Sequence, residues 1–183
     1  CKLPTEFGEF DLVTFRDTID NQVHFALKKG EVKADQPTLV RVHLHDVLSD
    51  LLLTDRHAAR SWPLPKSMAR IADEGGVLVV LGAEAHGAEL LARVKGFEAA
   101  DKGLAPEGAK WQGTSRRVGV GSQILKALGV GKMRLLSSPK KYHAHSGFGL
   151  EVVEYVGEQV PDGLNDYHGR SLRPWFFVAA LLC

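Results

Sequence analysis

The sequence predicts an α/β fold of the α+β kind, a mixed β-sheet with flanking helices whose N-terminal strands are antiparallel. Three observations lead to this prediction. Alternating apolar residues open the chain, Val77–Leu81 is a continuous apolar run, and segments with helical spacing lie before and after that run. A short apolar run is typical of a strand covered on both faces, so helices are expected against the sheet.

The first quarter of the chain is predicted to be mostly strand. Phe7–Phe15 and Gln22–Lys28 have the alternation of half-buried strands. A polar turn over Lys29–Gln36 leads into a third strand, Thr38–Leu44. Short connections of this kind predict an antiparallel start to the sheet.

From Ser61 onward, helices and strands alternate. Pro63 and Pro65 introduce a helix over Lys66–Glu74, and Gly75 and Gly76 end it before the apolar strand. The remaining predicted elements are a helix over Ala88–Glu98, a loop over Gly103–Gly113, a glycine-interrupted helix over Val118–Leu128 and a buried strand over Lys132–Leu136.

Composition limits the classes of function. With 183 residues, 44% of them hydrophobic, the chain can bury one substantial core without a metal or disulfide. A formal net charge of +1 gives no global attraction to nucleic acid or to a membrane. The two cysteines, Cys1 and Cys183, form no disulfide framework and no metal-binding pair, so a reducing cytoplasm is expected.

The two ends of the chain indicate a longer polypeptide. The chain starts with Cys1 and has no signal-peptide pattern, so we expect it to begin inside a larger protein. Pro174–Cys183 is apolar but about half the length of roughly 20 residues that spans a bilayer. A buried terminal segment, an interface element with Trp175, Phe176 and Phe177, or a cloning remnant is expected there rather than a membrane anchor.

Several motifs follow one another in a characteristic order. The chain contains Arg41-Val42-His43-Leu44-His45-Asp46, then Arg56-His57-Ala58-Ala59, with Lys2-Leu3-Pro4-Thr5 near its start and Arg134–Lys141 and Gly149–Glu154 towards its end. This series resembles GTP cyclohydrolase II of riboflavin biosynthesis, with its R-V-H-S-E-C, C-x-C, K-L-P-T and G-I-x-I-V-E motifs. The resemblance implies a family domain over residues 1–156 and a poorly matched tail over 157–183.

The zinc ligands of the family are altered. Its three cysteine positions fall on Asp46, His57 and Ala59. Because a catalytic zinc needs three protein ligands, the resemblance implies that the family's zinc and magnesium are not retained, and we expect no cofactor. The alternative is a rebuilt metal site of His45, Asp46 and His57. Strand alternation argues against it, since it places His43 and His45 on one face and Asp46 on the other.

The nucleotide-binding and catalytic positions are partly retained. The resemblance implies nucleotide-binding roles for Arg41, His43, Glu84, Ser137 and Lys141, with His86 in place of an arginine. Among the catalytic positions, Arg116 is kept, Thr114 replaces the aspartate that accepts a proton, and Phe97 replaces a tyrosine. A glutamine of the nucleotide pocket is replaced by Trp62. The alternative for Arg41 is a solvent-facing arginine at a sheet edge.

These changes predict a pseudoenzyme. The expected function is that of a degenerate GTP cyclohydrolase II-like domain that does not hydrolyse GTP and supports a fused 3,4-dihydroxy-2-butanone 4-phosphate synthase, a lyase, within a homodimer. Two alternatives stay open. One is an active enzyme with a rebuilt metal site, which converts GTP to a diaminopyrimidine ribosyl phosphate, formate and pyrophosphate. The other is a module that binds GTP or another phosphate ligand without turnover.

Overall fold

A computed structural model describes residues 1–19, 21–54, 56, 62–82, 87–104, 114–138 and 146–158. Several predicted features lie outside this part of the chain, namely His57, Ala59, Glu84, His86, Lys141, the segment 105–113 and the apolar segment Pro174–Cys183. The side chains of Thr114 and Arg116 are also not described, although their backbone is. No helix in the described ranges is long and apolar enough to cross a membrane.

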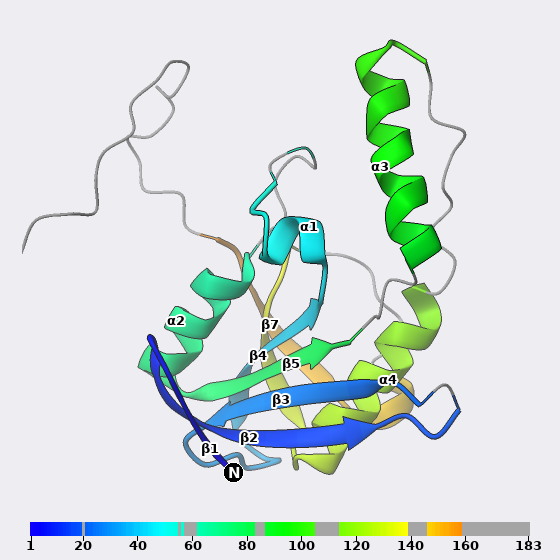
Figure 1. Ribbon diagram of the computed structural model, residues 1–183. Coiled ribbons are helices and arrows are strands. Elements are labelled where there is room, and N and C mark those ends of the chain that lie inside the picture. Colours follow the sequence, from blue (N-terminus) through cyan, green and yellow to red (C-terminus); the bar gives the residue numbers. More distant parts are fainter. Residues whose placement is uncertain are drawn as a thin grey trace, which may run out of the picture.

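Seven strands form one mixed sheet in the order β1-β2-β3-β5-β4-β6-β7 (Figure 1). Strands β1, β2, β3 and β5 are joined antiparallel, whereas β5, β4, β6 and β7 are joined parallel. The strands are β1 (Lys2–Thr5), β2 (Gly8–Arg16), β3 (Val23–Lys29), β4 (Pro37–Leu44), β5 (Gly76–Leu81), β6 (Lys132–Leu136) and β7 (Glu151–Val156). The mixed sheet and its antiparallel N-terminal strands are confirmed.

The expectation that the third predicted strand continues the antiparallel start is wrong. Strand β4 does not pair with β3, because β5 lies between them. Gly76 makes this insertion possible. Its backbone has φ of 139°, and a Cβ there would lie 2.3 Å from the carbonyl oxygen of Leu39 on β4. Only glycine allows the two strands to approach this closely at the start of β5.

Three of the four described helices, α2, α3 and α4, agree with the sequence prediction except at their ends. The helices are α1 (Val47–Asp50), α2 (Leu64–Glu74), α3 (Gly87–Asp101) and α4 (Thr114–Ala127), with a 3₁₀ turn at Ser146–Phe148. Helix α4 begins four residues before the predicted Val118. The one-turn helix α1 was not predicted, because one turn is too short to show a hydrophobic period.

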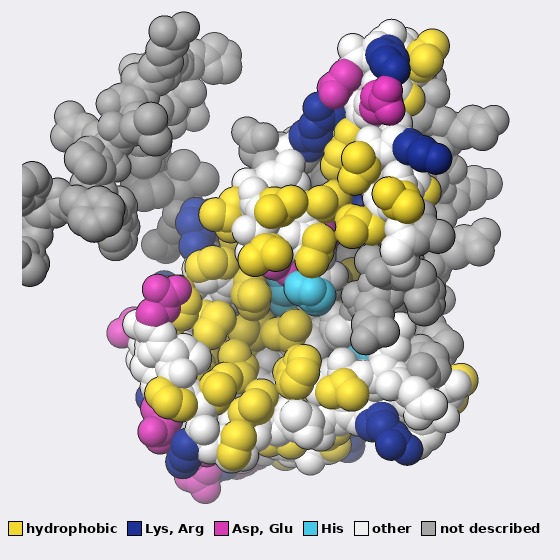
Figure 2. Space-filling view, in the orientation of Figure 1, with side chains coloured by type: hydrophobic (Ala, Val, Ile, Leu, Met, Phe, Trp, Pro, Cys, Tyr) yellow, Lys and Arg dark blue, Asp and Glu magenta, His cyan; other side chains and the backbone are white. Residues whose placement is uncertain are grey.

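The core lies on both faces of the sheet. On one face, α4 contributes Ile124 and Leu125 to a cluster with Val40 and Val79. On the other face, α2 contributes Ile71 to a second cluster. Strand β5 is covered on both sides, since Val77, Leu78 and Val79 are fully buried, as the continuous apolar run predicted. Figure 2 shows that hydrophobic side chains also remain visible on the α2 face.

Candidate functional site

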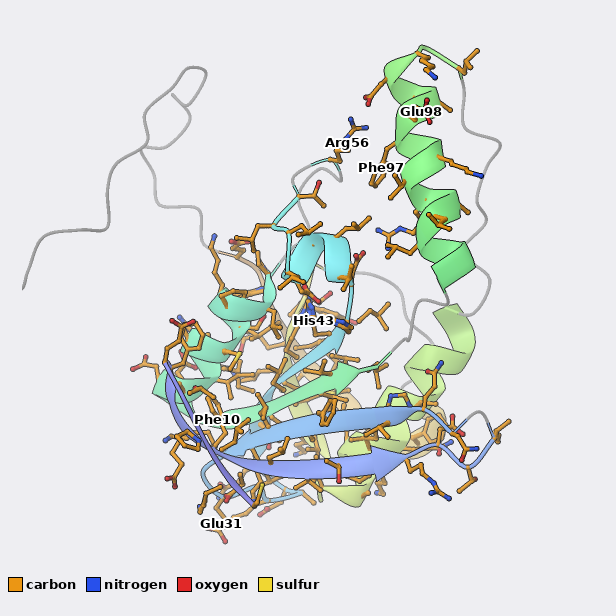
Figure 3. The ribbon with its side chains drawn as sticks, viewed as in Figure 1. Phe10, Glu31, His43, Arg56, Phe97 and Glu98 are labelled. Carbon is orange, nitrogen blue, oxygen red and sulfur yellow. The ribbon has the colours of Figure 1, made fainter. Side chains whose placement is uncertain are left out.

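The retained motif residues lie at the carboxyl end of β4. In the open α/β sheets of many proteins, ligands bind beyond the carboxyl ends of parallel strands. Here β4 ends at Leu44, and His45 and Asp46 lead directly into α1. Figure 3 shows His43 just below α1, with Phe97 on the neighbouring helix α3.

Two imidazoles share one buried carboxylate at this end of the strand. The Asp50 carboxylate lies 2.9 Å from His43 Nε2 and 3.2 Å from His45 Nδ1, and it accepts the backbone N–H of Asp46 at 2.8 Å. The side chains of His43 and Asp50 are 4% and 9% exposed, whereas that of His45 is 42% exposed. A carboxylate only accepts hydrogen bonds, so each of these imidazole nitrogens acts as the donor.

Asp46, which the sequence resemblance aligns with a zinc ligand of the family, makes contacts that hold the fold together. One carboxylate oxygen caps α1 by accepting the backbone N–H groups of Leu48 at 3.0 Å and Ser49 at 3.4 Å. The other accepts from Arg93 Nη2 on α3 at 2.9 Å. The side chains of both partners are largely buried. A guanidinium this close repels a divalent cation, so Asp46 does not fit as a zinc ligand.

The described donor set does not fit a zinc site. Within the described ranges, no group of three or more His, Cys, Asp or Glu side chains could hold a metal ion. The Asp50 carboxylate is bonded directly to two imidazoles, and Asp46 is paired with Arg93. His57, the third residue of the rebuilt site considered from the sequence, lies outside these ranges.

Arg41 is internal to the sheet. Its strand β4 lies between β5 and β6, so the alternative of an arginine at a sheet edge is wrong. Its Nη1 donates to the carbonyl oxygen of Leu136 at 2.7 Å, where β6 ends. The same guanidinium is one of the groups that lower the pKa of Glu158. Arg41 thus faces the ends of β6 and β7.

Phe97 and Ser137 have local partners. The guanidinium of Arg56 lies over the Phe97 ring, 5.1 Å from its centroid (Figure 3), and donates to the Phe97 carbonyl oxygen at 3.3 Å. The same guanidinium pairs with Asp101 at 2.6 Å. Ser137 directly follows β6, and its hydroxyl donates to the carbonyl oxygen of Ser138 at 3.0 Å.

Trp62 is a core residue. It is 7% exposed and packs in the cluster on the α2 face. Its Nε1 donates to the carbonyl oxygen of Val156 at 2.8 Å, and its backbone N–H donates to Glu158 Oε2 at 3.3 Å. The family resemblance placed a polar nucleotide contact at this position, which a buried indole now fills.

The structure therefore gathers only part of the predicted site. His43 and Arg41 lie on β4, with Ser137 after the neighbouring β6. Thr114 and Arg116 lie in the first turn of α4. Sequence reasoning gave no role to Asp50 or Arg93. Asp50 could have been found, because it follows Asp46 by one helical turn. No sequence pattern pointed to Arg93, because it lies on α3, 47 residues after Asp46.

The fold and these motif positions place the chain in a known family. The model of the GTP cyclohydrolase II family matches residues 1–157, so the chain belongs to that family. It is 47% identical over 157 residues to the 3,4-dihydroxy-2-butanone 4-phosphate synthase of Photobacterium phosphoreum, which covers 85% of this chain and 41% of the relative. It is 39% identical over 176 residues to the riboflavin biosynthesis protein RibBA of Parabacteroides distasonis, covering 92% and 43% of the two chains.

A solved structure agrees with this assignment. RibBX, a two-domain 3,4-dihydroxy-2-butanone 4-phosphate synthase from A. baumannii, has 35% sequence identity and a TM-score of 0.53 over 85% of this chain and 38% of that chain. The chain thus spans about two fifths of the length of the relatives it matches. Its relatives belong to riboflavin biosynthesis.

Proposed function

We propose that the chain is a domain that keeps the GTP cyclohydrolase II fold without hydrolysing GTP, and that it supports a 3,4-dihydroxy-2-butanone 4-phosphate synthase in the same polypeptide. The observation that carries the proposal is the use made of Asp46. At a position where the family holds zinc, this carboxylate caps a helix and binds Arg93. Two relatives named as that synthase or as a two-domain form of it support the second part.

The expected loss of rate is large. A catalytic metal activates the attacking water and stabilises the charge that develops in the transition state by several kcal/mol. A general base contributes roughly 10²–10⁴-fold in rate. Here Thr114 stands where the family has its aspartate and Phe97 where it has a hydroxyl, so the metal and both assisting groups are missing together. Negligible turnover of GTP follows.

The rebuilt-metal alternative is less well supported by these contacts. It needs Asp46 as a ligand together with His45 and His57, but Arg93 already neutralises the Asp46 carboxylate. The phosphate-binding alternative uses Arg41 together with Glu84, Arg116 and Lys141. Of these, the Arg41 guanidinium here donates to a backbone carbonyl. The proposal therefore includes no resident zinc or magnesium. It also includes a homodimeric assembly in the cytoplasm.

The test compares the full-length polypeptide with a version that lacks this domain. We expect far less than one zinc per chain by elemental analysis, and no formate from GTP above a no-protein control, with an active family member as positive control. Removal of the domain should lower the thermal stability or turnover of the synthase. Stoichiometric zinc with formate release would contradict the first part, and a truncated synthase of unchanged stability and turnover would contradict the second.

A further inference from the structure

An internal strand of the sheet has an uncovered apolar face. Strand β3 lies between β2 and β5, yet Val23 is 44% and Phe25 40% exposed. Phe25 is opposite Thr14 on β2 and Val80 on β5. Helix α2 covers the same face only further along, where Leu27 and Leu78 are buried against its cluster. Large side chains on a central strand are normally covered, whereas the described residues leave Val23 and Phe25 partly exposed here.

The uncovered surface continues beyond the sheet. Three consecutive leucines after α1 are exposed, Leu51 at 71%, Leu52 at 66% and Leu53 at 72%. Figure 2 shows hydrophobic side chains running from the N-terminal strands across the sheet to α1 and α3. We call the surface made by Val23, Phe25, Val80 and Leu51–Leu53 the apolar strip.

Exposure of this strip is costly in water. Burying one large aliphatic or aromatic side chain fully is worth about 1.5–3 kcal/mol. No member of the strip is charged, and contiguous apolar surface of this kind marks sites of protein association. A partner surface must accordingly be apolar at its centre, as protein interfaces are.

We propose that the apolar strip is the docking surface for the synthase part of the same polypeptide. This inference rests on the proposed function and names the surface through which the support acts. The matched relatives have more than half of their length outside the region that this chain spans.

A covalent connection favours the synthase part of the same polypeptide over a separate molecule as the partner of the strip. A domain joined by a short connection has an effective concentration in the millimolar range, so it can hold an apolar contact that would be weak between separate molecules. A second copy of the chain has no such advantage. Self-association through the strip is therefore the competing outcome that the experiment must separate.

The experiment uses the full-length polypeptide with Phe25→Asp, Leu52→Asp and a control, Val153→Asp. Val153 is 44% exposed on β7, at the opposite edge of the sheet, so the control has similar exposure on another surface. Leu52 lies outside the core, which keeps the test valid if Phe25→Asp fails to fold. We expect both strip variants to increase the radius of gyration by on the order of 10% and to increase binding of a hydrophobic dye. Val153→Asp should do neither.

Two outcomes would overturn the inference. If folded Leu52→Asp and Phe25→Asp keep the compactness of the parent protein, the strip is not the docking surface. If the 183-residue chain dimerises and Leu52→Asp abolishes the dimer, the occupant is a second copy. Neither result bears on the zinc and formate measurements or on removal of the whole domain, so the loss of GTP hydrolysis and the support of the synthase stand or fail separately.

Discussion

At the scale of single residues, Asp46 determines what the end of β4 can do. Its carboxylate satisfies two backbone N–H groups of α1 and one guanidinium. Its two oxygens make both sets of contacts at once, and aspartate is among the preferred helix-capping residues. Asp46 therefore has a structural role, because its contacts join β4, α1 and α3.

Asp46→Ala should destabilise the chain by about 2–3 kcal/mol, because it removes the helix cap and leaves the largely buried Arg93 without this partner. Asp46→Asn keeps a capping oxygen and should lose less. Urea unfolding of the three proteins measures the difference. Equal midpoints for all three would show that neither the cap nor the ion pair contributes.

Strand alternation predicted part of this site. Residues two apart on a strand share a face, and His43 and His45 indeed reach the same Asp50 carboxylate. The partner of Asp46 could not be predicted, because its contact with Arg93 depends on where α3 lies in space. Periodicity reports which face a residue occupies, not which distant helix meets that face.

At the scale of elements, most strands and helices could be predicted from the sequence. Strand β6 has the predicted bounds, and α2 begins two residues before the predicted Lys66. The position of β4 in the sheet could not be predicted, because β4 pairs with β5 and β6, which lie far from it in the sequence. The first turn of α4, Thr114–Arg117, is entirely polar, so no hydrophobic period revealed it, and the glycines that follow weaken the helical pattern.

Those glycines give a matched prediction. A Cβ added at Gly119 would meet nothing within 4 Å, whereas one at Gly121 would lie 3.2 Å from Val42 Cγ1 on β4. Gly119→Ala should stabilise the chain by up to about 1 kcal/mol, or about 2–4 °C in thermal midpoint. Gly121→Ala gains the same helix propensity but must displace Val42, so its midpoint should be lower than that of Gly119→Ala. Thermal unfolding followed by circular dichroism decides between them, and the reverse order would contradict the packing of α4 on β4.

At the scale of the whole molecule, Glu158 joins the end of the sheet to α2. Its carboxylate binds Lys66 and accepts the backbone N–H of Trp62, while the Trp62 indole donates to Val156. The hydrogen bond from Lys66 is the largest cause that lowers the pKa of Glu158 below its ordinary value of 4.5. These contacts join segments more than 90 residues apart in the sequence.

The sign of the resulting pH dependence follows from that lowered pKa. The contribution of Glu158 is fully present above pH 4.5 and is lost as the pH falls through the lower pKa of the folded state. Glu158→Gln should therefore destabilise the chain at neutral pH, by about 0.5–1 kcal/mol because Lys66 is largely exposed. Urea unfolding between pH 7 and strongly acidic pH measures this, with Glu6→Gln as the control for net charge. A difference that persists unchanged in strong acid would contradict the assignment.

The insertion of β5 between β3 and β4 also has a consequence for folding kinetics. Strands β3 and β4 are separated by a short connection, Gly30–Gln36, and loop closure favours a local hairpin between them. The native sheet instead requires that both edges stay open until Gly76–Leu81 can enter. We therefore expect a hairpin of β3 with β4 to act as a kinetic trap that must open before the native strand order can form. A nascent chain that ends before Gly76 carries two open strand edges, which makes that stage of synthesis the one most prone to aggregation.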